Sequence, residues 1–267
     1  MIYMKPFLSL LIVLALFTAC NNKEKDQPVA TGIDAQEKIM KDAINKFPDS
    51  LLLKENLIQY YRNNGNYDTA IAITNDAIKK DSTNPRLWDI KATLHFEDED
   101  TANTIKAYEK AIQLFPDPEY IMSLGSIYAE TKNIKALDMA DALLIGSKAR
   151  ADKEALFIKG LYYNYTGDKK KAIGFFDNCL AMDYTFMFAY REKAIALYDQ
   201  GKYEEALAVL DKAVTLQNNF DEGYYWTGRC LEKLNKPTEA IEQYKIALQY
   251  DPEFVEVKDA LARLGVK

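Results

Sequence analysis

A spacing of 34 residues that returns along most of the chain is the feature that most constrains its fold. Ala172, Ala206 and Ala240 follow one another at that distance, and residues 167–183 and 201–217 align over their whole length. Within these stretches the small residues share one face of an α-helix. A repeat of this length has room for two short helices, and stacked repeats bury a core that no single repeat has alone. The period therefore predicts a stack of helix pairs.

Small and large side chains return at fixed places when 34-residue units are counted from Leu51. The pattern resembles the tetratricopeptide repeat, a helix-turn-helix unit of that length. The resemblance implies an all-α fold, a right-handed α-solenoid of about six repeats over residues 51–254, and a protein-binding role. The matching residues are Ala92, Gly160, Ala194 and Gly228 at position 8; Ala70, Ala172, Ala206 and Ala240 at position 20; Tyr108, Phe176, Leu210 and Tyr244 at position 24; and Ala77, Ala111, Cys179, Ala213 and Ala247 at position 27.

Both ends of the array carry the partial units that a stack needs to cover its apolar ends. Residues 34–50 are expected to form an N-terminal half repeat, and residues 255–267 resemble the solvating helix that closes such arrays. The third repeat is out of step, because Leu124 and Gly125 lie one residue early and the frame returns only after residues 146–152. We expect a shifted third unit with a longer exit loop.

The first 19 residues have the layout of a secretory signal peptide, with Lys5 near the start and a largely apolar segment at residues 7–17. That segment is too short to span a bilayer as a helix. The sequence FTAC at residues 17–20 resembles the lipobox of bacterial lipoproteins, which implies lipid attachment at Cys20. The alternative is that Cys20 is an incidental small residue at the end of the signal.

Residues 20–33 are polar, contain proline and glycine, and show no apolar period, so they are expected to be a flexible tether. The lipoprotein resemblance implies a place in the bacterial cell envelope, anchored to the membrane through lipid on Cys20. Asn21 stands where an aspartate favours the inner membrane of enterobacteria, which implies the outer membrane, facing the periplasm; display on the cell surface is the alternative. The partner is then expected to be another envelope protein or peptide.

Charge and composition argue against several other classes of function. The net charge of −6 and pI near 5.1 do not give the basic surface on which nucleic-acid binding depends. The one histidine, His95, leaves little material for a histidine metal site or a histidine-dependent catalytic triad. We therefore expect no enzyme activity, no cofactor, no metal site and no nucleic-acid partner.

Three other features could suggest a functional site, but we expect each of them to have a structural role only. Cys179 and Cys230 fall several helices apart in the predicted stack, so both are expected to be buried free thiols. His95 stands at a position that tyrosine fills in other repeats, which favours packing. The acidic residues 97–100 lack the spacing of a calcium loop and are expected to form a solvated turn.

Positions 2, 5, 9 and 12 of each first helix share one side of that helix, which we call the first-helix face. In the tetratricopeptide family this side lines the binding groove. In units four to six it is rich in aromatic residues and arginine, which commonly dominate protein interfaces, whereas in units one and two it is mostly polar. The residues predicted to bind the partner are Phe157, Leu161, Phe188, Arg191, Tyr198, Tyr225 and Arg229.

Two alternatives to this prediction remain open. The aromatic residues of the first-helix face would also suit a glycan- or peptidoglycan-binding module, because aromatic rings stack on sugar rings. The capping helix would alternatively cover much of the face and leave it unavailable to a partner.

Overall fold

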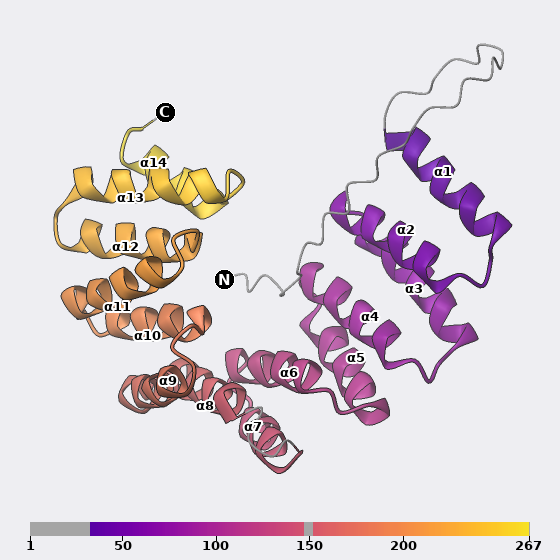
Figure 1. Cartoon of the computed structure of the whole chain (residues 1–267), viewed down its shortest axis with the longest axis horizontal. Helices are drawn as coiled ribbons and strands as arrows, with labels where there is room; N and C mark the ends of the chain where they lie inside the picture. Colours follow the sequence, from indigo (N-terminus) through magenta and orange to yellow (C-terminus); the bar gives the residue numbers. More distant parts are fainter. Residues whose placement is uncertain (1–32, 147–151, 267) are drawn as a thin grey trace. The chain divides into compact units, whose positions relative to one another are not determined.

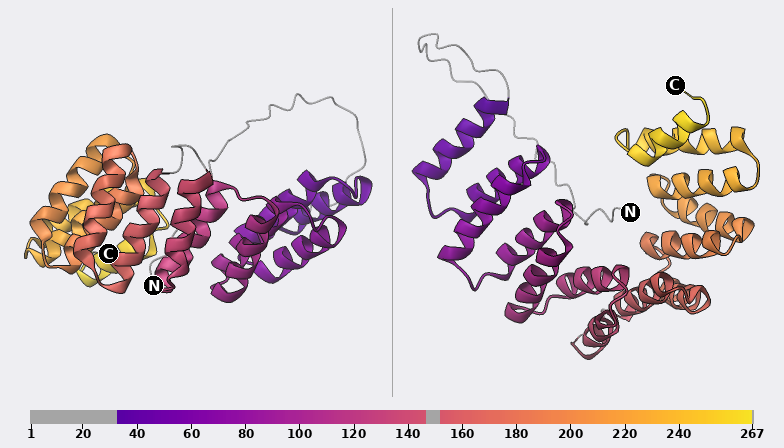
Figure 2. Two further views of the ribbon diagram at one scale, coloured as in Figure 1. Left: turned by 90° about the horizontal axis from the view of Figure 1, so that it is seen from below. Right: turned by 180° about the vertical axis from the view of Figure 1, so that it is seen from behind.

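The computed structural model describes residues 33–146 and 152–266, and 81% of these residues are helical. All of the regular structure in these ranges is α-helix, and consecutive helices follow one another as antiparallel pairs (Figures 1 and 2). This confirms the predicted fold class, an all-α solenoid of tetratricopeptide type. The predicted signal peptide, Cys20 and nearly all of the tether lie outside the described residues.

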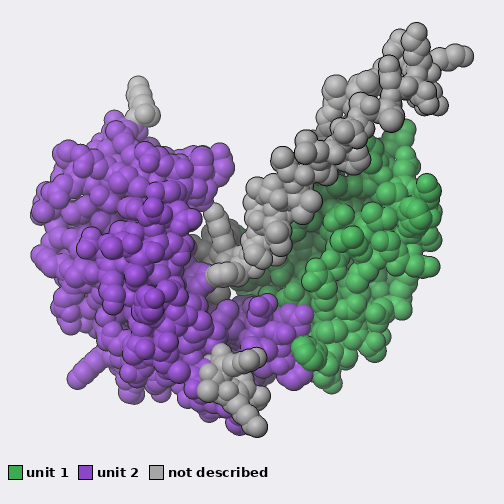
Figure 3. Space-filling model, in the orientation of Figure 1, with its two compact units in different colours: residues 1–115 green, residues 116–267 purple. Residues whose placement is uncertain are grey.

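The chain divides into two compact units, residues 1–115 and 116–267, which Figure 3 shows in different colours. The helices of unit 1 are α1 (Ile33–Lys46), α2 (Leu51–Asn63), α3 (Tyr67–Lys80), α4 (Pro85–Glu97) and α5 (Thr101–Leu114). The helices of unit 2 are α6 (Pro118–Glu130), α7 (Lys135–Gly146), α8 (Asp152–Thr166), α9 (Lys169–Met182), α10 (Met187–Asp199), α11 (Tyr203–Leu216), α12 (Asp221–Lys233), α13 (Pro237–Tyr250) and α14 (Val255–Arg263). No helix in the described ranges has the length and apolar content needed to cross a membrane.

The turn inside each helix pair is set by one residue with a left-handed backbone. Gly201 has φ +74° between α10 and α11, and the amide of Lys202 donates to the carbonyl of Leu197 at 3.0 Å, which closes the end of α10. Glycine suits this place because it lacks the Cβ that disfavours positive φ. The residues that occupy this turn along the chain are Gly65, Glu99, Lys132, Gly167, Gly201 and Asn235.

Local capping explains where several helices begin. The side chain of Asn84 accepts a hydrogen bond from the amide of Arg86, and Pro85 occupies the first turn of α4, where its missing N–H costs nothing. Asp168 caps α9 in the same way by accepting from the amide of Lys171. The helix α6 begins at Pro118, one residue ahead of the 34-residue frame, in agreement with the early small residues of the third repeat.

The core within each unit lies between the two helices of a pair and against the next pair. Ala206 and Leu210 of α11 are fully buried with Trp226 and Cys230 of α12 in one cluster. Where position 8 is glycine, the partner helix comes closest: a Cβ placed on Gly160 would lie 2.4 Å from Cε1 of Phe176. Glycine at position 8 thus makes room for the large ring at position 24 of the same repeat, as in Gly160 with Phe176 and Gly228 with Tyr244.

Candidate partner-binding face

The structure places the seven predicted partner-binding residues on the first helices α8, α10 and α12 of unit 2, but not all of them at the surface. Phe188, Tyr198, Tyr225 and Arg229 are partly exposed. Phe157, Leu161 and Arg191 are buried, with exposed fractions of 3%, 1% and 2%. These three side chains therefore present almost no surface to a partner, while the binding role of the seven residues stays a prediction.

Phe157 is buried because aromatic rings from the neighbouring segments close over it. Its ring centroid lies 5.1 Å from that of Phe186, in the loop before α10, and 5.9 Å from that of Phe176 on α9. Phe188 stands at the edge of this group, 5.7 Å from Phe186. Edge-to-face contacts of this kind stabilise a core beyond the area that they bury. Phe157 therefore supports the face from beneath, while Phe188 remains within reach of a partner.

Arg191 is buried because two glutamates neutralise it. Its Nε donates to Glu192 at 3.0 Å, and its Nη1 donates to both carboxylate oxygens of Glu222 on α12, at 2.7 and 2.8 Å. The guanidinium also lies over the ring of Phe188 at 5.2 Å. A buried charge needs such pairing, because removing it from water unpaired is costly. Arg191 thus joins α10 to α12 rather than facing a partner.

The same two positions are joined in unit 1 with the charges exchanged. Arg86 of α4 donates from Nε and Nη2 to the two carboxylate oxygens of Glu55 on α2, at 2.7 and 2.8 Å. In unit 2 the arginine is the earlier residue, Arg191, and the glutamate is the later one, Glu222. Bidentate pairs of this kind fix geometry as well as charge. Positions 5 and 2 of successive first helices therefore carry a structural ion pair in both units.

Arg229 lies among aromatic rings on the remaining part of the face. Its Cζ is 5.6 Å from the ring centroids of Tyr198 on α10 and Tyr225 on α12, and 5.5 Å from that of Trp226. It donates to the hydroxyl of Tyr225 at 2.7 Å and to that of Tyr198 at 3.4 Å. A cation over several ring faces is held by their quadrupoles. These four residues, Tyr198, Tyr225, Trp226 and Arg229, form what we call the arginine cage.

The C-terminal helix α14 packs against one side of the arginine cage, because Tyr225 contacts the cluster that includes Val257 and Leu261 of α14. Arg263 of α14 pairs with Glu232 of α12 at 2.8 Å, and the ring of Phe254, just before α14, lies 5.2 Å from that of Tyr225. Tyr225 and Arg229 nevertheless keep part of their surface exposed. The capping helix therefore contacts position 12 of the last repeat and the Tyr225 side of the cage, and it leaves part of Tyr225 and Arg229 exposed.

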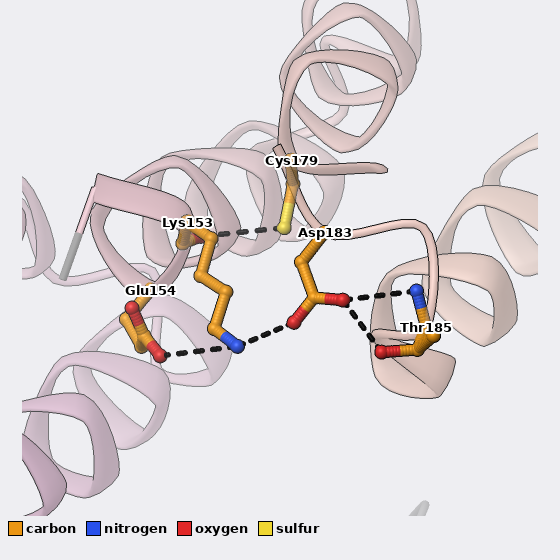
Figure 4. A network of polar contacts seen from close by, with 5 residues as sticks. All are labelled: Lys153, Glu154, Cys179, Asp183 and Thr185. Carbon is orange, nitrogen blue, oxygen red and sulfur yellow. Dashed lines mark hydrogen bonds and ion pairs between the residues drawn. The ribbon is translucent and has the colours of Figure 1, made fainter. Parts of the chain in front are cut away.

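A second polar network fixes the start of α8 against the end of α9 (Figure 4). The ammonium group of Lys153 lies between the carboxylates of Asp183 and Glu154, and Asp183 accepts from both the amide and the hydroxyl of Thr185. The thiol of Cys179 donates to the carbonyl of Lys153 at 3.3 Å. The hydrogen bond from Lys153 lowers the pKa of the Asp183 carboxyl to about 2. Apart from the buried Oε2 of Glu154, which has no hydrogen-bond partner, these groups contact one another, so the network serves the packing of the repeat.

Cys179, Cys230 and His95 are buried as expected, whereas the acidic residues form a solvated turn only in part: Asp98 and Glu99 are exposed, but Glu97 ends α4 and pairs with Arg62. Cys179 and Cys230 are buried free thiols, and burial raises the pKa of each to about 12, which leaves them unreactive as nucleophiles. His95 is buried beside Asp100, the residue just before α5, and burial lowers the pKa of His95. Asp100 caps α5 by accepting from the amide of Asn103. Within residues 33–146 and 152–266 no group of three or more His, Cys, Asp or Glu side chains is placed to hold a metal ion.

Sequence reasoning missed two residues that shape the face, and both stand at position 6 of a first helix. Glu192 neutralises Arg191 from the neighbouring position, and Trp226 supplies the buried ring beneath Arg229. Position 6 lies outside the set 2, 5, 9 and 12, so the helical period alone gave no reason to include either. The signal that was available is an acidic or aromatic residue directly adjacent to a position on the face.

Comparison with known proteins agrees with this architecture. Residues 191–253 match the family model of the tetratricopeptide repeat. A tetratricopeptide repeat protein from Parabacteroides merdae has a similar structure, with a TM-score of 0.71 and 19% identity over 87% of this chain and 92% of that one. The type IV pilus biogenesis factor PilW is similar with a TM-score of 0.58 and 20% identity, over 78% of this chain and 97% of that one. At these identities the likeness shows the fold alone.

One curated relative is similar in sequence over most of the chain. Superkiller complex protein 3 of Homo sapiens is 25% identical over 223 residues, which is 79% of this chain and 14% of the human protein. The chain therefore spans about one seventh of the length of that relative. The chain therefore has the tetratricopeptide repeat fold, and residues 191–253 match the model of that family.

Proposed function

We propose that this tetratricopeptide repeat protein is a lipid-anchored scaffold of the bacterial envelope, which binds a protein or peptide partner on the first-helix face of unit 2. The observation that carries the proposal is the arginine cage. Tyr198, Tyr225 and Arg229 are partly exposed and adjacent on α10 and α12, whereas the neighbouring rings of Trp226 and Tyr244 are buried. Repeats of this family serve protein–protein interaction, and tyrosine, tryptophan and arginine are the residues that most often dominate such interfaces.

The neighbouring contacts hold the arginine cage in place before any partner arrives. Tyr198 packs edge-on against Trp226 at 5.5 Å and against Tyr203 at 5.2 Å, and the ion pair between Arg191 and Glu222 joins the two helices that carry the cage. A binding surface that is rigid in advance loses less side-chain entropy on association. This supports a binding role for the cage.

The envelope location rests on the amino-terminal sequence. The signal-like first 19 residues, the FTAC sequence ending at Cys20 and the polar tether that follows support a lipid anchor, with the repeat array held near a membrane surface. Asn21 supports the outer membrane, with the array in the periplasm. The glycan-binding alternative uses the same face and predicts a different bound species.

Affinity capture from membranes after mild crosslinking, followed by mass spectrometry, tests the proposal. The full chain with Tyr198→Ala and Arg229→Gln should recover its partner at least about thirtyfold less well than wild type, which corresponds to about 2 kcal/mol for interface anchors. The matched control is Leu52→Ala with Arg86→Gln, which removes one exposed apolar side chain and one exposed arginine from the first-helix face of unit 1. The control should capture the partner as wild type does.

Two results would contradict the proposal. If both double variants are folded by circular dichroism and lose partner capture equally, the binding face does not lie on unit 2. Recovery of peptidoglycan fragments without a protein would favour the glycan-binding alternative.

A further inference from the structure

Arg229 is the one arginine among the described residues that forms no ion pair with a glutamate. Each of the others contacts a glutamate, whereas Arg229 contacts only aromatic rings and two tyrosine hydroxyls. The glutamate pairs are Arg62 with Glu97, Arg86 with Glu55, Arg191 with Glu192 and Glu222, and Arg263 with Glu232. In these ranges the positive charge of every other arginine is therefore neutralised by a glutamate, whereas the charge of Arg229 is not.

The surroundings of Arg229 would strengthen an ion pair formed there with a carboxylate. A guanidinium has five N–H donors, and the two tyrosine hydroxyls accept from its two terminal nitrogens. Those hydroxyls are neutral, so the positive charge stays unbalanced. Trp226, which is 8% exposed, and the partly buried tyrosines displace water from around the guanidinium. An ionic hydrogen bond formed there is screened less than one in open water.

We infer that the arginine cage recognises a carboxylate side chain, an aspartate or glutamate that the partner presents next to an apolar residue. The inference rests on the proposed function and adds the chemistry of the partner. A planar guanidinium pairs with a carboxylate through two parallel hydrogen bonds. The tyrosine rings lie on two different helices, α10 and α12, so a peptide that continues on both sides of its acidic residue meets an aromatic surface on each side.

A phosphate group fits the arginine cage less well. It carries up to two negative charges at neutral pH, and its recognition commonly uses a cluster of arginines. Within the described part of the chain, Arg229 is the one cation that lies over the rings of the cage. One cation matches one carboxylate.

Selection of peptides on the full-length protein in detergent micelles tests the inference. The probes are random twelve-residue peptides displayed on phage, and the winners are then synthesised with amidated C-termini, so that no free terminal carboxylate is present. We expect winners with an acidic residue at one fixed place beside an apolar residue. Arg229→Gln should weaken their binding by about tenfold or more, as expected for loss of a hydrogen bond to a charged group. Arg86→Gln should leave it unchanged.

A double-substitution cycle separates this inference from the proposed function. Exchanging the acidic residue of the peptide for its amide should cost as much as Arg229→Gln, and both changes together should cost no more than either alone. Binding that needs Tyr198 and Tyr225 but ignores both the acidic residue and Arg229→Gln would overturn the inference and leave the proposed function standing. Winners that bind only with a free C-terminus would also overturn it. Failure to select any peptide that needs Tyr198 would overturn both.

Discussion

Alanine in place of Gly160 should destabilise the protein, although alanine normally favours a helix interior. The Cβ of alanine would lie 2.4 Å from Cε1 and 2.7 Å from Cδ1 of Phe176, whereas ordinary contacts begin at 3.4 Å. The ring would have to withdraw by about 1 Å, and it is fully buried against Phe157. Overpacking costs roughly 1–3 kcal/mol, and the helix preference of alanine over glycine returns about 1 kcal/mol. We expect a net loss of up to about 2 kcal/mol.

Gly174 on α9 of the same repeat provides the matched control. A Cβ at Gly174 would meet nothing within 4 Å, and the residue is exposed in a helix interior. Gly174→Ala should therefore stabilise the protein by about 0.5–1 kcal/mol. Thermal unfolding followed by circular dichroism measures both changes, at roughly 2–4 °C per kcal/mol for a unit of this size. The same chemical change is thus expected to shift the melting temperature in opposite directions.

The Phe176→Leu background tests the cause of the difference. The fifth repeat pairs Ala194 with Leu210 at the corresponding positions, and both are buried there. With leucine at 176, Gly160→Ala should become neutral or mildly stabilising, because the clash is gone and the helix preference remains. If Gly160→Ala stabilises the wild-type protein as Gly174→Ala does, the close approach of the ring at position 24 is not what fixes the repeat.

Three further predictions concern the anchor, the stacking and the pH dependence. Cys20→Ser, expressed in a bacterium that processes lipoproteins, should abolish incorporation of labelled palmitate and partition into membranes; a labelled, membrane-bound serine variant would contradict the lipid anchor. Ala206→Leu, which forces bulk into a fully buried contact at a cost of about 1–3 kcal/mol, should raise hydrogen exchange mainly in α10 to α12, whereas a uniform rise would argue against repeat-by-repeat stacking. The pKa of Glu130 is raised from its ordinary 4.5 to about 7. Burial is the main cause and the negative charge of Glu192 adds to it, while the positive charge of Arg191 acts in the opposite direction. Because the folded state then binds more protons than the unfolded state, this group lowers stability as pH rises from about 4.5 to 7, so Glu130→Gln should show a smaller fall in melting temperature over that range; identical slopes would contradict this.

The repeat architecture could be predicted from the sequence because it depends on side-chain size at fixed spacing. Glycine or alanine at position 8 faces an aromatic or leucine side chain at position 24. This complementarity of size can be read from the sequence, as in Gly160 with Phe176 and Ala194 with Leu210. The division of the chain after Phe115 could not be predicted in this way. It depends on how strongly neighbouring pairs contact one another, and the period gives only their order.

The candidate site could be predicted only in part because exposure depends on neighbours from other helices. Helical spacing placed Phe157 and Phe188 on the same side of their helices, but Phe186 covers Phe157 and leaves Phe188 accessible. Arg191 and Arg229 are both arginines beside aromatic rings in the sequence. Only the structure shows that glutamates neutralise Arg191 and that Arg229 has none.

Site-directed photocrosslinking in intact cells tests most directly whether unit 2 carries the binding face. Benzoylphenylalanine would be placed in the full chain at Phe188 or Tyr225 in unit 2, and at Leu52 or Gln59 on the first-helix face of unit 1. These positions keep part of their surface exposed, and the first two already hold aromatic rings. Illumination should yield a discrete protein adduct from positions 188 and 225 and little from 52 and 59. Adducts of equal yield at all four positions, or adducts confined to unit 1, would contradict the account.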